Sequence, residues 1–267
     1  MNRLLSIFFI SFLTVIFMVA PASVSAQRRE VVEQPNLIKL NALSLFAGKF
    51  GVEYERLITE RISVGAELGW RPNSRIPFRS AIKGFANDGD FTDMIDGFKS
   101  SSFSFTPEVR FYTSKRGPFR GFYVAPYVRY ASFGATAPYD LDINFNYMGQ
   151  LVYERYETIP LTGRVRSFTG GASIGANFKL AEKWYLDWRI IGPSFGSGRG
   201  SVAGNVALNE QEQQAIREDL AELQQDLRDF PLSIKTDYTV DGNGIKVDVQ
   251  RSKWAAVRAG LSIAYRF

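Results

Sequence analysis

Apolar and polar side chains alternate with a period of two residues along much of this chain, and this alternation constrains the fold more than any other feature. In residues 61–71, every second side chain from Ile62 to Trp70 is apolar, and charged residues, serine and glycines occupy the positions between them. Period two is typical of strands with two chemically different faces. The same pattern marks seven further segments, which are residues 37–46, 50–57, 102–113, 122–133, 166–180, 184–190 and 254–267. We therefore expect an all-β chain with an even number of strands.

The expected connections alternate in length, apart from the first hairpin. Short links fall at residues 59–60, 114–120 and 181–182, whereas long links span residues 72–101, 134–164 and 194–253. Outer-membrane barrels combine short periplasmic turns, long external loops and an even strand number. The sequence therefore predicts an eight-stranded antiparallel transmembrane β-barrel over residues 36–267, with the three long links as external loops.

The two faces of the predicted strands differ in charge, which separates a membrane barrel from a soluble one. The apolar faces hold no charged residue within the strand bodies, whereas the opposite faces hold charges of both signs. An Arg or Lys facing lipid near the midplane costs about 2–4 kcal/mol, so we expect the charged faces to line the lumen. The expected lumen residues are Lys39, Glu53, Glu55, Glu67, Glu108, Arg110, Arg129, Asp187, Arg189 and Arg258.

These lumen charges have two interpretations. Side chains just fill the interior of an eight-stranded barrel, so paired charges would form a plug; the alternative is a narrow, charge-lined pore. Acid/base catalysis by Glu53 and Glu55 lacks an accompanying nucleophile or oxyanion feature. The chain has no histidine and no cysteine, which excludes a Ser-His-Asp triad, a histidine-ligated zinc and thiolate chemistry. We expect neither an enzyme nor a cofactor.

Two prolines interrupt the predicted strands. Pro107 and Pro126 lie inside segments that otherwise read as strand. Proline cannot donate to a ladder, and a closed barrel has no free edge on which to place it. We therefore expect a bulge or a locally missing hydrogen bond at each proline.

The first residues read as an export signal. Asn2 and Arg3 precede an apolar run over residues 4–20, and a small-residue stretch ends at Ala26. This is the pattern of a cleaved secretory signal peptide over residues 1–26, and residues 27–35 form a short segment before the barrel. Basic residues are scattered rather than gathered in a patch, so no nucleic-acid partner is expected.

The last residues, Trp254 to Phe267, carry an aromatic or aliphatic side chain at every second place and end in Phe. This ending resembles the C-terminal assembly signal of outer-membrane barrels, with Leu261, Ile263, Tyr265 and Phe267 as its positions. With Lys39-x-Asn41, the run 53–56 and the run 121–123, the chain is similar to an uncharacterised family of small outer-membrane barrels of Bacteroidetes, in the class of OmpA and OmpX. The resemblance implies a bacterial outer membrane and its lipid as surroundings, and insertion by the barrel-assembly machinery.

The last long link contains a predicted helix over about residues 209–230. Asn209 and Glu212 form a capping box, and Pro231 ends the helix. One apolar stripe runs along it, formed by Ile216, Leu220, Leu223, Leu227 and Phe230. The stripe either packs within the chain or docks a surface protein partner. A hairpin over residues 234–249, with Asp241-Gly242-Asn243-Gly244 at its turn, is expected beside it.

An acidic run in the first long link is a weak calcium candidate. Asp88, Asp90, Asp93 and Asp96 lie close together, but the run lacks the glycine and glutamate positions of an EF-hand loop. A solvated acidic loop is the preferred interpretation. Together these features favour a non-enzymatic barrel with a structural or surface-interaction role, in which the external loops form a recognition surface. The alternative is a small channel.

Overall fold

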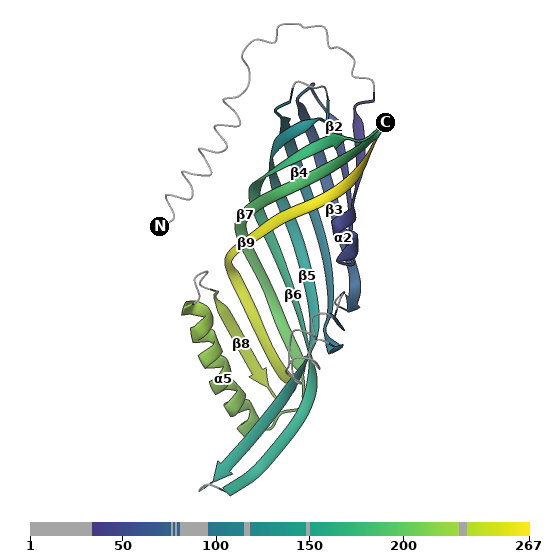
Figure 1. Cartoon of the computed structure of the whole chain (residues 1–267). Coiled ribbons are helices and arrows are strands. Elements are labelled where there is room, and N and C mark those ends of the chain that lie inside the picture. Colours follow the sequence, from purple (N-terminus) through teal and green to yellow (C-terminus); the bar gives the residue numbers. More distant parts are fainter. Residues whose placement is uncertain are drawn as a thin grey trace, which may run out of the picture. The chain divides into compact units, whose positions relative to one another are not determined.

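In the computed structural model, the chain is described over residues 34–267 except residues 76, 78, 81–95, 115–117, 148–149 and 230–233. Eight strands form a closed antiparallel ring in the order β1-β2-β3-β4-β5-β6-β7-β9, in which β9 also pairs with β1 (Figure 1). The predicted eight-stranded barrel is therefore confirmed. The elements are β1 (Asn36–Asn41), α2 (Ala42–Phe46), β2 (Phe50–Leu57), β3 (Ile62–Arg75), β4 (Lys99–Tyr112), β5 (Gly121–Tyr147), β6 (Gln150–Lys179), β7 (Trp184–Asn205), α5 (Glu210–Asp229), β8 (Thr236–Asp241) and β9 (Gly244–Arg266).

The ring places apolar side chains outside and charged side chains inside. On β2, Val52 and Tyr54 point outward and are 42% and 44% exposed, whereas Glu53 between them is buried. The same inversion holds on β5, where Val128 is exposed beside the buried Tyr127. An outward apolar face with an inward polar face is the arrangement of a barrel that sits in lipid. No helix in the described part of the chain is long and apolar enough to cross a bilayer.

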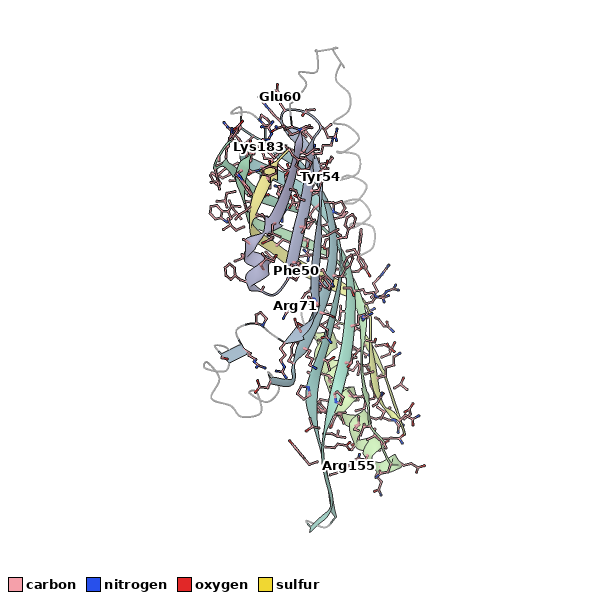
Figure 2. The ribbon with its side chains drawn as sticks, turned by 90° about the vertical axis from the view of Figure 1, so that its right-hand side faces the viewer. Phe50, Tyr54, Glu60, Arg71, Arg155 and Lys183 are labelled. Atoms are coloured by element: carbon pink, nitrogen blue, oxygen red, sulfur yellow. The ribbon has the colours of Figure 1, made fainter. Side chains whose placement is uncertain are left out.

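The short links gather at one end of the ring, here called the turn end. Glu60, in the β2–β3 turn, and Lys183, in the β6–β7 turn, both lie there, whereas Arg155 lies at the far end of the molecule (Figure 2). The chain's last residue also reaches the turn end, because Phe267 exchanges backbone hydrogen bonds with Asn36 at 3.1 and 3.2 Å.

The first strand is shorter than predicted. Residues 37–46 were expected to be one strand, but β1 ends at Asn41 and α2 follows at once. The Asn41 side chain accepts a hydrogen bond from the backbone N–H of Ser44 at 3.0 Å. Asparagine is a favoured helix N-cap residue, so the cap overrides the apolar alternation that continues through α2.

Two of the three expected loops are mostly regular structure, which corrects the boundaries predicted for residues 134–164, now nearly all strand, and 194–253, now strand and helix. Four strands, β5, β6, β7 and β9, continue past the ring and pair with one another, as Figure 1 shows. We call this continuation, with β8 and α5, the extension. Thr136 of β5 still pairs with Lys99 of β4, and beyond this point β5 pairs with β6 alone. Sheet pairing satisfies the backbone groups that a loop would leave to water.

The extension has its own apolar core, in which α5 covers one face of the sheet. Asn209 and Glu212 cap the helix reciprocally, with N–H···O distances of 2.9 and 2.8 Å. The predicted hairpin is confirmed, since β8 and β9 pair from Thr236–Val249 to Asp241–Gly244. The buried core residues are Leu141, Ile159, Val206, Leu208, Ile216 and Val240.

The two prolines interrupt one ladder. The residue pairs between β4 and β5 stay in the same register on both sides of the prolines. No pair is formed at Pro107 or at the position opposite Pro126. Both prolines pair normally on their other side, Pro107 with Ala66 and Pro126 with Ala172. The backbone nitrogen of each proline, which carries no hydrogen, therefore faces the same β4–β5 seam. The ladder lacks hydrogen bonds there, and no bulge is needed.

Candidate functional site: the charged barrel interior

Nine ionisable side chains meet inside the ring, and each comes from a position where period-two alternation turns it inward. Their side chains are at most 8% exposed. They come from β1, β2, β3, β4, β7 and β9, so most strands of the ring contribute. The members, here called the ion-pair network, are Lys39, Glu53, Glu55, Glu67, Glu108, Arg110, Asp187, Arg189 and Arg258.

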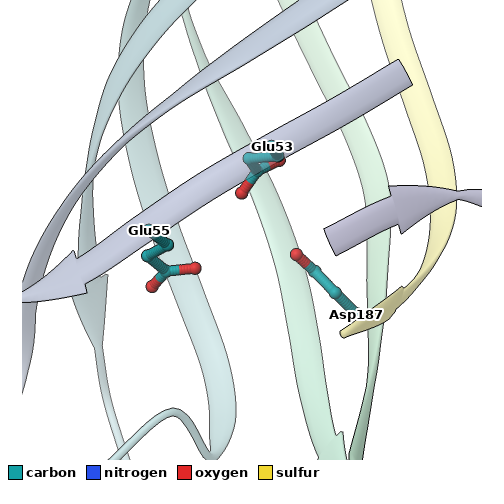
Figure 3. Close-up of side chains that lie close together, drawn as sticks. All are labelled: Glu53, Glu55 and Asp187. Atoms are coloured by element: carbon teal, nitrogen blue, oxygen red, sulfur yellow. The ribbon is translucent and has the colours of Figure 1, made fainter. Parts of the chain in front are cut away.

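Three carboxylates converge near the turn end and resemble a cation site. Glu53 and Glu55 of β2 and Asp187 of β7 point toward one another (Figure 3), and their oxygens lie within 4.8 Å. The ammonium group of Lys39 already contacts all three, with Nζ at 2.8 Å from Glu53 and 2.6 Å from Asp187, and also against Glu55. A lysine thus supplies the positive charge that a bound metal would otherwise bring.

Arg110 lies at the centre of the network. Its guanidinium nitrogens approach Glu53 at 2.6 Å, Glu108 at 2.5 Å and Asp187 at 2.5 Å. The ring of Tyr123 stacks against the same guanidinium, with 4.3 Å between the guanidinium carbon and the ring centroid. A planar guanidinium offers five donors in a fixed fork, and here carboxylates surround it on several sides.

Two further arginines extend the network away from the turn end. Arg189 contacts Glu53, Glu67 and Glu108 at 2.9–3.0 Å. Arg258 contacts Glu67 at 2.7 Å and Glu108 at 3.3 Å, and it stacks on the ring of Tyr127. Every carboxylate in the network therefore faces at least one cation, and each buried charge has the partner that its desolvation requires.

An aromatic cluster fills the interior between the ion-pair network and the turn end. Phe119, in the β4–β5 turn, is fully buried and adopts a positive φ of 55°. Its ring centroid lies 6.3 Å from that of Tyr112 and 6.4 Å from that of Tyr185. Sequence reasoning missed this residue, because residues 114–120 read as a polar turn. The available signal was one large aromatic side chain after Gly117-Pro118.

One predicted lumen residue stays outside the network. Arg129 is half-buried and has no ion pair with the residues that the structure describes. Glu53 and Glu55, considered above for acid/base chemistry, both contact Lys39 and Arg110. Glu55 thus has two cations as neighbours, and Glu53 has three, since Arg189 also contacts it.

The predicted helix stripe divides into a covered and an uncovered part. Ile216 is buried in the core of the extension, and Leu220 packs against that core. Leu223 is 46% exposed, whereas the side chain of Leu227 and all of Phe230 lie outside the described residues. Packing within the chain therefore accounts for the first part of the stripe.

Within the extension, Arg155 connects β6 to the first turn of α5. It donates to Glu212 at 3.0 Å and contacts Glu157, and these two hydrogen bonds raise the pKa of Arg155 above its ordinary value. The acidic run 88–93 lies outside the described residues, and Asp96 lies 3.8 Å from Arg79.

The C-terminal positions line the outer face of β9. Leu261, Ile263 and Phe267 are 38–48% exposed, and Tyr265 packs edge-on against Trp184 with centroids 5.2 Å apart. Here β9 pairs with β7 on one side and with β1 on the other. Three of the four predicted assembly positions thus belong to the strand that closes the ring, and Phe267 follows it directly.

Comparison with known proteins gives a family. The family described as "Protein of unknown function (DUF3575)" matches residues 12–196. The chain belongs to this family. The DUF3575 match spans the strands from β1 to most of β7 and leaves α5, β8 and β9 outside it. No curated protein matches the chain.

Two solved structures are similar to this DUF3575 chain. A major outer membrane protein from Thermus thermophilus has 13% identity and a TM-score of 0.38, over 87% of this chain and 98% of that one. The N-terminal β-barrel domain of OprF from Pseudomonas aeruginosa has 11% identity and a TM-score of 0.27, over 88% of this chain and 98% of that one.

Proposed function

We propose that this chain is an exported outer-membrane β-barrel with a filled interior, which has a structural or surface-interaction role and performs no chemistry. One observation carries the proposal: the ring is inverted, with its charges paired inside and its large apolar side chains outside. In water this arrangement would expose an apolar belt around the whole ring, which soluble proteins avoid. In a bilayer, contact between this apolar belt and the lipid acyl chains stabilises the ring.

The proposal assigns different parts of the molecule to different tasks. The signal peptide over residues 1–26 would direct export, and the C-terminal strand would be recognised by the barrel-assembly machinery. The extension would then stand outside the bilayer and present the acidic, exposed side of α5 to a protein partner. Supporting this, Leu223 and the neighbouring Glu218, Asp219 and Glu222 are exposed.

A charge placed on the outer face tests the membrane location. Val128 lies on β5 with its side chain outward and 43% exposed. In phosphatidylcholine vesicles, Val128→Arg is expected to lower the free energy of unfolding by about 2–4 kcal/mol, because lipid cannot solvate the guanidinium. Urea unfolding followed by tryptophan fluorescence measures the change.

The matched control places the same charge on the extension. Ala221 is an exposed position of α5, so Ala221→Arg is expected to change stability by less than about 0.5 kcal/mol. If Val128→Arg were equally neutral, the outer face would be in contact with water and the membrane location would be wrong.

Single-channel recording separates the filled barrel from the channel. The wild-type protein in a planar bilayer is expected to carry no steady current, since the ion-pair network and the Phe119 cluster occupy the interior. A stable, ion-selective conductance would instead favour the small channel with a charge-lined lumen. An insertion control is provided by the resistance of the folded protein to SDS before boiling.

A further inference from the structure

Basic residues that are scattered in the sequence gather, contrary to the expectation above, in an exposed patch on the outer face of the sheet where the ring passes into the extension. The strand register brings basic side chains of β6, β7 and β9 onto the same face of the sheet at this point. Arg166 pairs directly with Arg199, and Lys253 lies opposite Ser197. The basic patch consists of five exposed residues, which are Arg164, Arg166, Arg199, Arg251 and Lys253.

The patch adjoins the apolar outer face of the ring. Phe168 is two residues from Arg166 on β6 and is 56% exposed. Phe195 stands four residues before Arg199 on β7 and is 72% exposed. Since alternate residues of a strand share a face, each aromatic side chain projects on the same side as the nearby arginine. The basic groups therefore begin where the apolar surface ends.

A bulge in β9 brings a further positive charge next to Arg199. The β7–β9 register shifts between Gly198 and Gly200, so that Gln250 and Arg251 both fall opposite Arg199. A second exposed basic pair lies across β5 from the patch, where Arg75 of β3 is directly opposite Lys99 of β4.

The chain does not neutralise these charges. Among the residues that the structure describes, no member of the patch has an ion-pair partner. The nearest outward carboxylate on β9, that of Asp248, is paired with Lys246 at 2.7 Å. Like charges directly opposite each other on adjacent strands are destabilising, so the Arg166–Arg199 pair has a cost that nothing described in the fold offsets.

We propose that the basic patch binds the phosphate groups of lipid headgroups at the bilayer surface. This inference rests on the membrane location proposed above. A row of cations next to an exposed apolar belt matches a headgroup layer, in which phosphates lie directly above the acyl chains. Arginine and lysine near such a surface attract anionic lipid by an amount that salt screens. Guanidinium groups also bind phosphate oxygens in a bidentate fashion.

Quenching by brominated lipids tests the proposal on the full-length protein. Trp70, Trp184 and Trp188 are about half exposed on the outer face, so their fluorescence reports the lipids in contact with the ring. The protein is reconstituted in vesicles that contain brominated phosphatidylcholine or brominated phosphatidylglycerol. We expect phosphatidylglycerol to compete about fivefold better than phosphatidylcholine, and the preference to decrease as salt is raised.

Three sets of variants locate the preference. The combined substitutions Arg166→Gln, Arg199→Gln and Lys253→Gln are expected to reduce the preference to about one. Arg166→Lys with Arg199→Lys keeps the charge and should retain most of the preference. The control set Arg228→Gln, Lys235→Gln and Lys246→Gln removes three exposed cations of the extension away from the apolar belt and should leave the preference unchanged.

Each outcome has a defined meaning. Equal quenching by both lipids in the wild type, or an unchanged preference in the patch variant, would overturn the inference while leaving the barrel in the membrane. Loss of the preference on adding inorganic phosphate, at an ionic strength at which sodium chloride leaves the preference intact, would also overturn it, because the patch would then be a site for the free anion. Absence of quenching by either lipid would instead contradict the membrane location itself.

Discussion

Replacement of Arg110 by methionine is expected to lower the free energy of unfolding by about 3–5 kcal/mol, because it leaves buried carboxylates without their central cation. Arg110 contacts Glu53, Glu108 and Asp187, and its side chain is completely buried. Methionine has a similar volume, so packing changes less than charge. Urea unfolding of the protein in lipid vesicles measures the loss.

Two variants check that charge causes the loss at Arg110. Arg110→Lys keeps a cation but loses the forked geometry, and should cost less than Arg110→Met. The double variant Arg110→Met with Glu108→Gln removes one charge of each sign and should recover part of the stability. If the double variant were as unstable as the sum of the two single ones, coupling between these side chains would be absent.

Truncation of Phe119 to alanine is expected to cost about 3–5 kcal/mol, the usual range for a buried aromatic side chain. Phe119 is fully buried between Tyr112 and Tyr185 and closes the turn end of the interior. Its removal opens a cavity that the rigid ring cannot collapse to fill. Urea unfolding in detergent micelles measures this effect.

The control for Phe119 lies three residues away. Phe122 is 64% exposed on the outer face of β5, so Phe122→Ala should cost less than about 1 kcal/mol in detergent micelles. Similar losses for the two phenylalanines would show that Phe119 does not pack in the interior. Phe119→Gly also removes the positive-φ strain, and a stability above that of Phe119→Ala would measure that strain.

The ring was predictable from sequence because its two faces differ in polarity at every step. Glu53 between Val52 and Tyr54 is enough to orient β2, and the same contrast recurs on the other strands. The interior charges follow from this alternation alone. Which carboxylate meets which cation was not predictable, since Lys39 and Asp187 are far apart in sequence and meet only through strand register.

The strands of the extension were predicted as loops, because alternation of apolar and polar side chains marks a strand only within the apolar belt. The outer side of β6 carries Arg164, Thr162 and Pro160 there, which read as loop. Bulges at residues 189–192 of β7 and 249–252 of β9 also shift the phase of the pattern. The short helix α2 could have been recognised from Asn41 and Ser44, which form an N-cap signal, but the apolar residues that follow obscured it.

The pairing of β1 with β9 has a consequence for biogenesis. Asn36 donates through its side-chain amide to the backbone carbonyl of Phe267 at 3.3 Å, across 231 residues of chain. The first strand therefore has no partner on one side until the last residues have been made. Contacts so distant along the chain fold slowly, and an unpaired strand edge invites aggregation. In the membrane location proposed above, the free edge of β1 must therefore be protected until β9 has been made, and the ring can close only then.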